Sequence, residues 1–321
     1  MDFRPRCEAP GGRSSGPSRS RSRIFRAAGR LYIRLPRRYP PPEFVRSSRS
    51  HPREGTASGM LERSYTAQVA AEEKLEGPPA LLARSDWTRD HPWLIHGVTL
   101  AGDEEGHGMG FRIFGGDRGG SALDRWEALR TASGMDLVVH ARQVHGSAVR
   151  VVRAGSAGIL LAPACDGYLT RDPGILLTVA LADCVPVFLL EPESRTLGLL
   201  HAGWRGSAAG ILEVGVREMW DRFGIPAADL HMHLGPAIGP DRYEVGPEVL
   251  EAVGVPQNPG GGLDLRAILA ARARSVGIPA DRIGVSSVCV HDDPRFYSHR
   301  GGDEGRHLAV FGYLGRPGVR S

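Results

Sequence analysis

Cysteine is scarce in this chain of 321 residues, which holds only Cys7, Cys165, Cys184 and Cys289. Four cysteines at such wide and irregular spacing do not form a disulfide framework of the kind that small secreted domains use. We therefore expect a reducing, cytoplasmic location, with free thiols available as metal ligands or nucleophiles.

Long hydrophobic runs are also missing. The longest, residues 175–190, is interrupted by Thr178 and Asp183, whereas a membrane-spanning helix needs roughly 20 consecutive apolar residues. The first residues contain no apolar region of the kind found in signal peptides. Because 41% of the residues are hydrophobic, the chain can bury a sizeable core, and the sequence predicts a globular protein without a membrane partner.

The chain also contains neither a Walker phosphate loop nor a GxGxxG fingerprint. If the protein binds phosphate, it does not hold a nucleotide through a phosphate loop.

Lysine is nearly absent, since Lys74 stands alone against 39 arginines. Fourteen of these arginines lie in residues 1–59, which carry a net charge of +10, while residues 60–321 carry −6. This Ser-, Pro- and Gly-rich segment is typical of a disordered tail. It could be a nucleic-acid-binding arm, a transit peptide, or translated upstream sequence with Met60 as the true start. The shortage of lysine along the whole chain favours the last interpretation, because it indicates GC-rich coding.

The remaining chain divides into a linker and a domain. A weak helical pattern up to Gly77 and a polar link to Trp93 predict a helical linker over 60–92, and we expect one domain over 93–315. Apolar runs and alternation predict strands at 94–100, 110–114, 137–141, 148–153, 175–182, 196–200, 230–234, 283–290 and 308–313. Amphipathic spacing and turn residues predict helices at 121–133, 207–223, 244–253 and 264–276. Asp166, before Gly167, is interpreted as part of a turn. The sequence thus predicts an α/β protein.

Two apolar runs end close to residues that can bind a metal or attack an electrophile. Cys184 follows run 175–182, and His201 follows run 196–200. His145 lies at a kink after run 137–141, beside a glycine that permits close backbone approach. If neighbouring strands bring these three residues to one edge of a sheet, their nitrogen and sulfur donors suit zinc, with a fourth position open for water.

Other interpretations of the same residues stay open. Cys165 or Cys289 could complete a structural site with four protein ligands. Cys184 could instead be a thiolate nucleophile paired with His145 or His201, or simply a buried thiol.

The turn after His201 has the features of an anion site. It leads into the strongest helical pattern of the chain, and Ser207 is expected to cap that helix, whose unpaired N–H groups would face an anion. Arg205 would add a fork of donors. Arg205 and Ser207 are therefore candidate phosphate-binding residues.

Seven short motifs occur in an order that resembles one protein family. They are QVHG (143–146), DGYLT (166–170), ADCVPVFLL (182–190), HAGWRG (201–206), GPAIGP (235–240), YEVG (243–246) and FYSHR (296–300). On these motifs the chain resembles the bacterial polyphenol oxidase, or laccase-domain, family. The family is also known as the multi-copper polyphenol oxidoreductase or peptidoglycan editing factor family, is purine nucleoside phosphorylase-like, and is related to laccase domain-containing protein 1.

The resemblance implies a fold, a metal and an activity. The fold is a mixed β-sandwich flanked by helices, of the cytotoxic-necrotizing-factor-like cysteine hydrolase type. The metal is zinc, in preference to copper, bound by His145, Cys184 and His201. The activity is phosphorolysis of adenosine, inosine, guanosine and methylthioadenosine, with deamination of adenosine. Oxidation by several copper centres would need more histidine-rich ligand sets than this sequence offers.

The implied chemistry assigns roles to further residues. Cys184, Asp183 and Arg205 are the candidate catalytic residues: Arg205 would hold the attacking phosphate, and Asp183 would orient a ligand or move a proton. Arg300 is a candidate anion contact from the C-terminal loop, and Arg306 is a weaker candidate from the same loop.

Two other functions remain as alternatives. The domain could be a hydrolase that edits a peptidoglycan precursor through Cys184 or the zinc. It could also be a metal-stabilised binding module that contacts nucleic acid only through residues 1–59.

Overall fold

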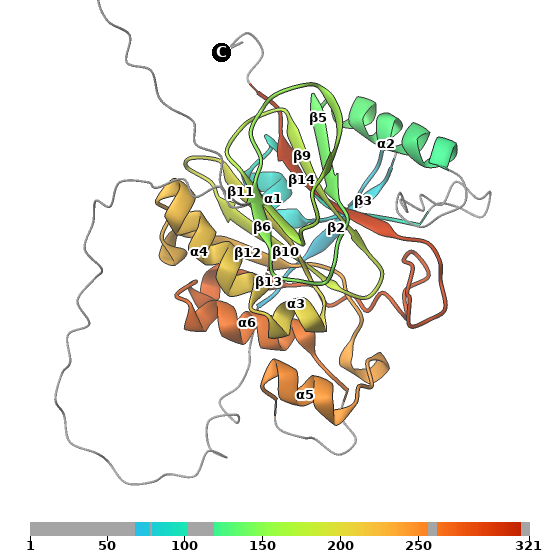
Figure 1. The fold of residues 1–321 in the computed structure, drawn as a ribbon, viewed down its shortest axis with the longest axis vertical. Coiled ribbons are helices and arrows are strands. Elements are labelled where there is room, and N and C mark those ends of the chain that lie inside the picture. The colour runs from blue at the N-terminus through green and yellow to red at the C-terminus, as the bar shows by residue number, and fades with distance from the viewer. Residues whose placement is uncertain (1–67, 78, 102–118, 256–261, 316–321) are drawn as a thin grey trace, which may run out of the picture. The chain divides into compact units, whose positions relative to one another are not determined.

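The computed structural model describes residues 68–77, 79–101, 119–255 and 262–315, and all of them belong to one unit of the chain, 58–321 (Figure 1). The predicted disordered tail and the predicted strand 110–114 lie outside the described residues. No helix in the described ranges combines the length and the apolar character needed to cross a membrane.

The described strands form two mixed sheets. In order across the first sheet they are β1 (Gln68–Val69), β13 (Ile283–Val285), β12 (His231–Leu234), β10 (Val185–Glu191), β11 (Thr196–Ala202), β8 (Gly167–Thr170) and β6 (Val149–Val151). In order across the second they are β2 (Glu72–Leu75), β3 (Leu81–Arg84), β4 (Leu94–Thr99), β14 (His307–Tyr313), β9 (Ile175–Leu181), β5 (Leu137–Ala141) and β7 (Gly158–Ala162). Each sheet contains both parallel and antiparallel pairs.

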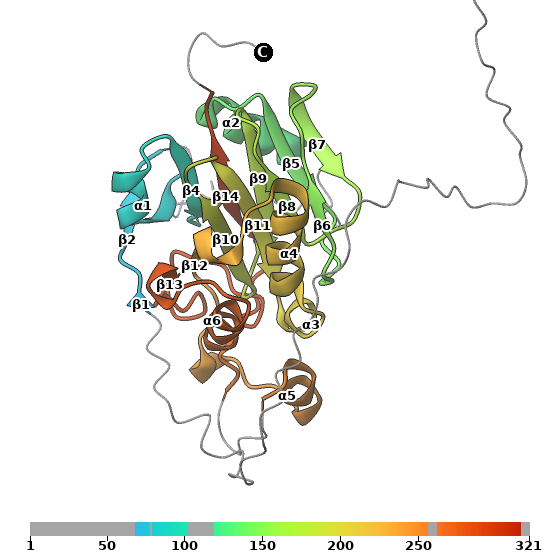
Figure 2. The ribbon, with the colours of Figure 1, turned by 90° about the vertical axis from the view of Figure 1, so that its left-hand side faces the viewer.

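The two sheets pack face to face, and helices cover their outer faces (Figures 1 and 2). Phe188 of β10 meets Phe311 of β14 edge to face, with ring centroids 5.3 Å apart. The helices are α1 (Ser85–Asp90), α2 (Gly119–Ser133), α3 (Trp204–Ala208), α4 (Ile211–Phe223), α5 (Pro247–Val253) and α6 (Leu265–Ser275). Helices α4 and α6 pack on the first sheet and α2 on the second. The prediction of an α/β protein is confirmed, with two mixed sheets.

The helix predicted over 207–223 is interrupted. Gly210 adopts a left-handed conformation (φ +76°) that separates α3 from α4, and the N-cap of α3 is Gly203 rather than Ser207. The helical spacing predicts one apolar face made of Leu212, Val216, Met219, Trp220 and Phe223. This prediction is wrong for Trp220, which is 58% exposed, while Leu212 and Met219 are buried.

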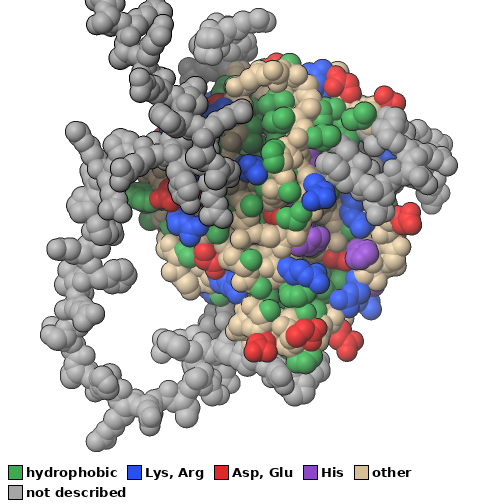
Figure 3. Space-filling view, in the orientation of Figure 1, with side chains coloured by type: hydrophobic (Ala, Val, Ile, Leu, Met, Phe, Trp, Pro, Cys, Tyr) green, Lys and Arg blue, Asp and Glu red, His purple; other side chains and the backbone are tan. Residues whose placement is uncertain are grey.

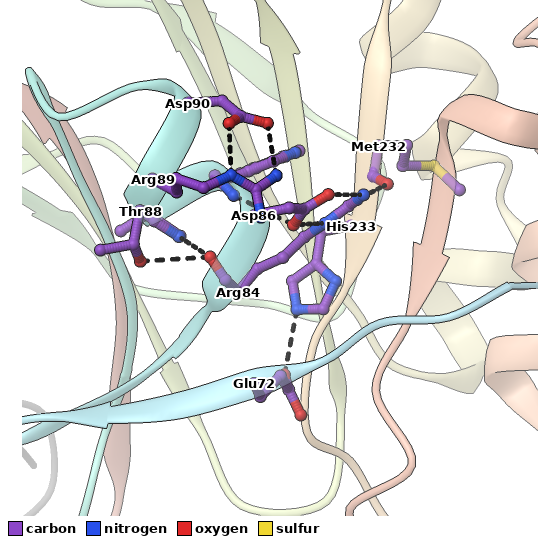
Figure 4. Close-up of polar contacts among 10 residues, drawn as sticks. Glu72, Arg84, Asp86, Thr88, Arg89, Asp90, Met232 and His233 are labelled. Carbon is purple, nitrogen blue, oxygen red and sulfur yellow. Dashed lines mark hydrogen bonds and ion pairs between the residues drawn. The ribbon is translucent and has the colours of Figure 1, made fainter.

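The helical pattern predicted up to Gly77 does not form a helix where the structure describes it. Residues 68–75 form β1 and β2 instead. Figure 4 shows part of the reason: the Glu72 carboxylate lies 3.1 Å from Nε2 of His233 on β12. The same carboxylate accepts a hydrogen bond from Ser286 Oγ at 2.6 Å. These partners lie far along the chain, so a weak local helical pattern yields to tertiary pairing.

Candidate metal centre

His145, Cys184 and His201 lie close together, at the point where the chain passes from the second sheet to the first. His145 follows β5, Cys184 connects β9 of the second sheet to β10 of the first, and His201 lies near the end of β11. In the antiparallel register of β10 and β11, Pro186 stands opposite His201, which brings Cys184 beside it. One ligand atom from each of the three residues lies within 4.8 Å of the other two. The structure thus brings together the three residues that the sequence singled out.

One buried carboxylate, Asp166, positions both histidines. Its Oδ1 accepts a hydrogen bond from the His145 N–H at 2.9 Å and lies 2.9 Å from His201 Nδ1. Its Oδ2 accepts from the N–H groups of Gly146 and Val144, at 2.8 and 3.2 Å. An ionised carboxylate only accepts, so Nδ1 of His201 carries a proton and Nε2 is left for a metal. The same bonds hold His145 at φ +56°, a conformation that is uncommon without glycine.

The sequence analysis missed this role, because Asp166 was interpreted as part of a turn. The one available signal was its place at the start of the DGYLT motif. Burial raises the pKa of Asp166, but the bonds from His201 and the Gly146 N–H lower it overall, so the carboxylate is ionised.

Two glycines of the HAGWRG motif allow the segments to approach one another. A Cβ on Gly203 would lie 2.9 Å from Cys184 Sγ, and a Cβ on Gly206 would lie 2.9 Å from the Gly146 carbonyl oxygen. Side chains at these positions would push α3 away from the centre.

Cys184 and His201 polarise each other. Burial alone would raise the pKa of the Cys184 thiol, but the charge of His201 and hydrogen bonds from both histidines lower it to about 6. Burial alone would lower the pKa of His201, but the charge of Cys184 and the bond to Asp166 raise it to about 9. At neutral pH the pair is a thiolate and an imidazolium.

The three residues open into a cavity of about 530 Å³. Its lining comprises His140, Ala141, Arg142, Gln143, His145, Ala180, Ala182, Asp183, Cys184, His201, Gly203, Trp204, Arg205, Tyr243, His299, Arg300 and Arg306. The predicted catalytic and anion-binding residues Asp183, Arg205, Arg300 and Arg306 therefore share one cavity with the candidate ligands. Ser207 is buried within α3 and does not line it.

Asp183 anchors the C-terminal loop to the cavity. Its carboxylate accepts hydrogen bonds from Ser298 Oγ at 2.6 Å and from the Arg300 N–H at 2.7 Å. Asp183 adopts φ +89°, which these bonds help to hold. The guanidinium of Arg205 stacks on Trp204, 4.3 Å from the ring centroid.

The donor set fits a transition metal. Two imidazole nitrogens and a thiolate suit zinc, and three protein ligands leave a coordination position for water or substrate. Cys165 and Cys289 are not part of the group, so the described residues offer no fourth cysteine ligand. Within the described ranges this is the one cluster of histidine, cysteine and carboxylate side chains with metal-binding geometry.

Comparison with known proteins shows which family the chain is similar to. Residues 108–313 match the family model described as multi-copper polyphenol oxidoreductase laccase. The chain is 34% identical over 191 residues to purine nucleoside phosphorylase YlmD of Geobacillus stearothermophilus, covering 53% of this chain and 70% of the relative. It is 32% identical over 212 residues to adenosine deaminase RL5 of an unknown prokaryote, covering 58% of this chain and 78% of the relative.

The fold is shared with a solved relative. The crystal structure of YlmD from Geobacillus stearothermophilus superposes with a TM-score of 0.68 at 28% identity, covering 77% of this chain and 99% of that one. The chain belongs to the multi-copper polyphenol oxidoreductase laccase family.

Proposed function

We propose that the chain is a cytoplasmic, zinc-dependent purine nucleoside phosphorylase that also deaminates adenosine. The main observation behind the proposal is that His145, Cys184 and His201 form one group and that this group opens into a cavity. Arginine side chains line that cavity. The names of the similar proteins, purine nucleoside phosphorylase and adenosine deaminase, support both reactions. Adenosine, inosine, guanosine and methylthioadenosine are the proposed nucleosides.

In this proposal the metal ligands, the carboxylates and the arginines have separate roles. Zinc bound by the three ligands would supply a Lewis acid and activate water for attack on the purine ring. Asp166 holds Nε2 of His201 toward the ion site. Arg205, steadied by Trp204, binds the co-substrate phosphate that attacks the ribose carbon, and Asp183 keeps Arg300 at the cavity wall as a second anion contact.

Product analysis tests the proposal directly. Protein of known zinc content is incubated with adenosine, with and without inorganic phosphate. Free adenine that forms only with phosphate supports phosphorolysis, and inosine supports deamination. If neither product forms with zinc-loaded protein, the proposed function is wrong.

We expect an Arg205→Ala variant to lose phosphorolysis selectively. Removing a charged donor to phosphate should lower kcat/KM for phosphate by about 10- to 100-fold, because a charge-assisted hydrogen bond contributes about 1.5–3 kcal/mol. Steady-state rates at varied phosphate concentration measure the effect. Arg217→Ala, on the neighbouring helix α4 and outside the cavity lining, is the matched control. Unchanged phosphorolysis in the Arg205 variant would refute the phosphate assignment.

Zinc affinity should rise with pH. A proton on His201 competes with the metal until the pH passes about 9, whereas Cys184 is already ionised above about 6. Between these values the apparent affinity should increase by about tenfold per pH unit, with release of about one proton. Competition with a chromophoric chelator across this range measures the slope. A flat profile would show that His201 does not bind zinc in competition with a proton.

A thiol hydrolase acting on a peptidoglycan precursor is the second candidate. The lowered pKa of Cys184 beside His201 favours it, and so would a sandwich of the cysteine hydrolase type. Removing the metal separates the two functions: a zinc enzyme loses activity with a chelator and regains it with zinc, whereas a thiolate nucleophile keeps its activity.

A further inference from the structure

The side chain of Gln143 connects two strands beyond the point where their pairing ends. The parallel register of β5 and β9 reaches as far as Val139 and Leu177. Past that point, Gln143 Nε2 donates a hydrogen bond to the Ala180 carbonyl at 2.8 Å, and Gln143 Oε1 accepts one from the Ala180 N–H at 2.7 Å. The amide side chain therefore bonds the main chain of β9 as a neighbouring strand would.

These two bonds join the segments that carry two of the candidate metal ligands. Gln143 stands two residues before His145, and Ala180 stands four residues before Cys184. Because both bonds go to the same residue of β9, they fix the direction of approach as well as the distance. The turn that carries His145 is thus tied to the strand that leads into Cys184.

Each pair of candidate ligands is held by a different connection. Asp166 accepts from the His145 N–H and lies 2.9 Å from His201 Nδ1, which joins the two histidines. The antiparallel ladder of β10 and β11 keeps His201 beside Cys184. His145 and Cys184 form the third pair, and the amide of Gln143 supplies a side-chain link between their segments.

The turn that carries His145 depends on such links because it lies at the surface. Figure 3 shows histidine side chains at the molecular surface beside side chains of Lys or Arg. His145 is an exposed residue, and its neighbour Val144 is 49% exposed. A segment with few buried contacts opens easily, whereas a metal ligand must lie within about 0.2 Å of its bonding distance. Hydrogen bonds must therefore supply the rigidity that packing does not.

We propose that Gln143 is a positioning residue of the candidate metal centre, and that its amide sets the separation of His145 and Cys184 before a metal ion binds. Its oxygen and its nitrogen both bond Ala180, so the effect passes through the main chain of the two segments. This inference rests on the proposed function for its zinc ion, but it does not depend on which reaction the ion serves.

Metal binding tests the inference without relying on turnover. Gln143→Met keeps the length of the side chain but removes both bonds to Ala180. We expect the affinity for zinc, measured by competition with a chromophoric chelator at fixed pH, to fall by about tenfold or more. Gln143→Asn carries the same amide on a shorter stem that cannot reach both atoms, so its affinity should be intermediate. If Gln143→Met does not fold, Gln143→Asn carries the same test.

Cobalt(II) in place of zinc gives a second measurement, which reports geometry in the folded protein. The absorption bands of cobalt bound by two imidazoles and a thiolate depend on how the ligands are arranged around the ion. The bands should shift or weaken in Gln143→Met, including the sulfur-to-cobalt band that reports the bond to Cys184. A role limited to stabilising the sheet would leave these bands unchanged.

Two control variants separate positioning from stability. Gln68→Met makes the same substitution on the exposed strand β1, outside the cavity lining, and should change neither measurement. Thr170→Val removes a hydrogen bond to the Val152 carbonyl, 3.0 Å long, that also runs from a side chain to the main chain. This variant should lower the midpoint of denaturant unfolding but keep the zinc affinity and the cobalt bands of the unaltered protein.

The outcomes distinguish failure of the inference from failure of the proposed function. Unchanged zinc affinity and cobalt bands in Gln143→Met, or a change no larger than in Thr170→Val, would overturn the inference and leave the zinc centre in place. An unaltered protein that binds no zinc would overturn both. Weaker zinc binding by Gln143→Met, in a protein that neither phosphorolyses nor deaminates adenosine, would support the inference and remove the proposed function.

Discussion

A Cys184→Ala variant is expected to lose tight zinc binding and to lower kcat/KM for adenosine phosphorolysis by about 10³-fold or more. The thiolate is the one anionic ligand of the group, and metal-ion stabilisation of a transition state is worth several kcal/mol. Zinc content after dialysis and steady-state kinetics on the same preparation measure both effects.

Cys289→Ala is the matched control for this substitution. Cys289 is also a free thiol, but its Sγ accepts from the Gly239 N–H and lies outside the cavity lining. The control should keep both zinc and activity. If Cys184→Ala keeps stoichiometric zinc but loses activity, Cys184 is a nucleophile rather than a ligand.

An Asp166→Asn variant should weaken zinc binding by about 10- to 100-fold and lower the free energy of unfolding by about 3 kcal/mol. An asparagine side chain keeps the shape of Asp166 but has one accepting oxygen, so its amide group would face main-chain N–H donors. The first effect follows from the loss of orientation of His201 and His145, and the second from buried donors left without an acceptor. Chelator competition and denaturant unfolding measure the two quantities.

Asp172→Asn provides the comparison. Asp172 also accepts a main-chain hydrogen bond, from the Ala154 N–H at 2.7 Å, but it lies in a partly exposed loop and outside the cavity lining. Its substitution should change stability by less than about 1 kcal/mol and leave zinc affinity alone. If Asp166→Asn behaves like Asp172→Asn, the carboxylate does not position the histidines.

Most elements of the fold were predictable because their patterns are local. The strand predicted at 137–141 matches β5, and the helix predicted at 264–276 corresponds to α6, with Asp264 as its N-cap. The strand predicted at 283–290 ends at Val285, and the hydroxyl of the next residue, Ser286, donates a hydrogen bond to Glu72. The separate strand β10 was missed, since its residues continue the apolar run of β9 and only the turn at Asp183 divides them.

The candidate ligands were predictable for a different reason. His145, Cys184 and His201 each stand at or beside the end of an apolar run, and their residue types limit the chemistry to metal binding or nucleophilic attack. Their partner Asp166 was not predictable in this way, because an aspartate before a glycine has the same local appearance in any turn. For Ser207 the sequence suggested a role that the structure does not support. Ser207 was predicted to cap a helix, but that helix begins earlier, with Gly203 as its N-cap, and Ser207 is buried inside it.

The sequence by itself determined the class of the fold, the identity of the three metal-binding candidates and the resemblance to a family, because each depends on residue type, period or motif. The tertiary structure alone decided which groups share the site. In the structure, Asp166 hydrogen-bonds the main chain around His145 and the ring of His201, and Asp183 hydrogen-bonds the C-terminal loop. Four arginines line one cavity. These contacts join residues that are 20 to more than 100 positions apart, and no local pattern encodes such a distance.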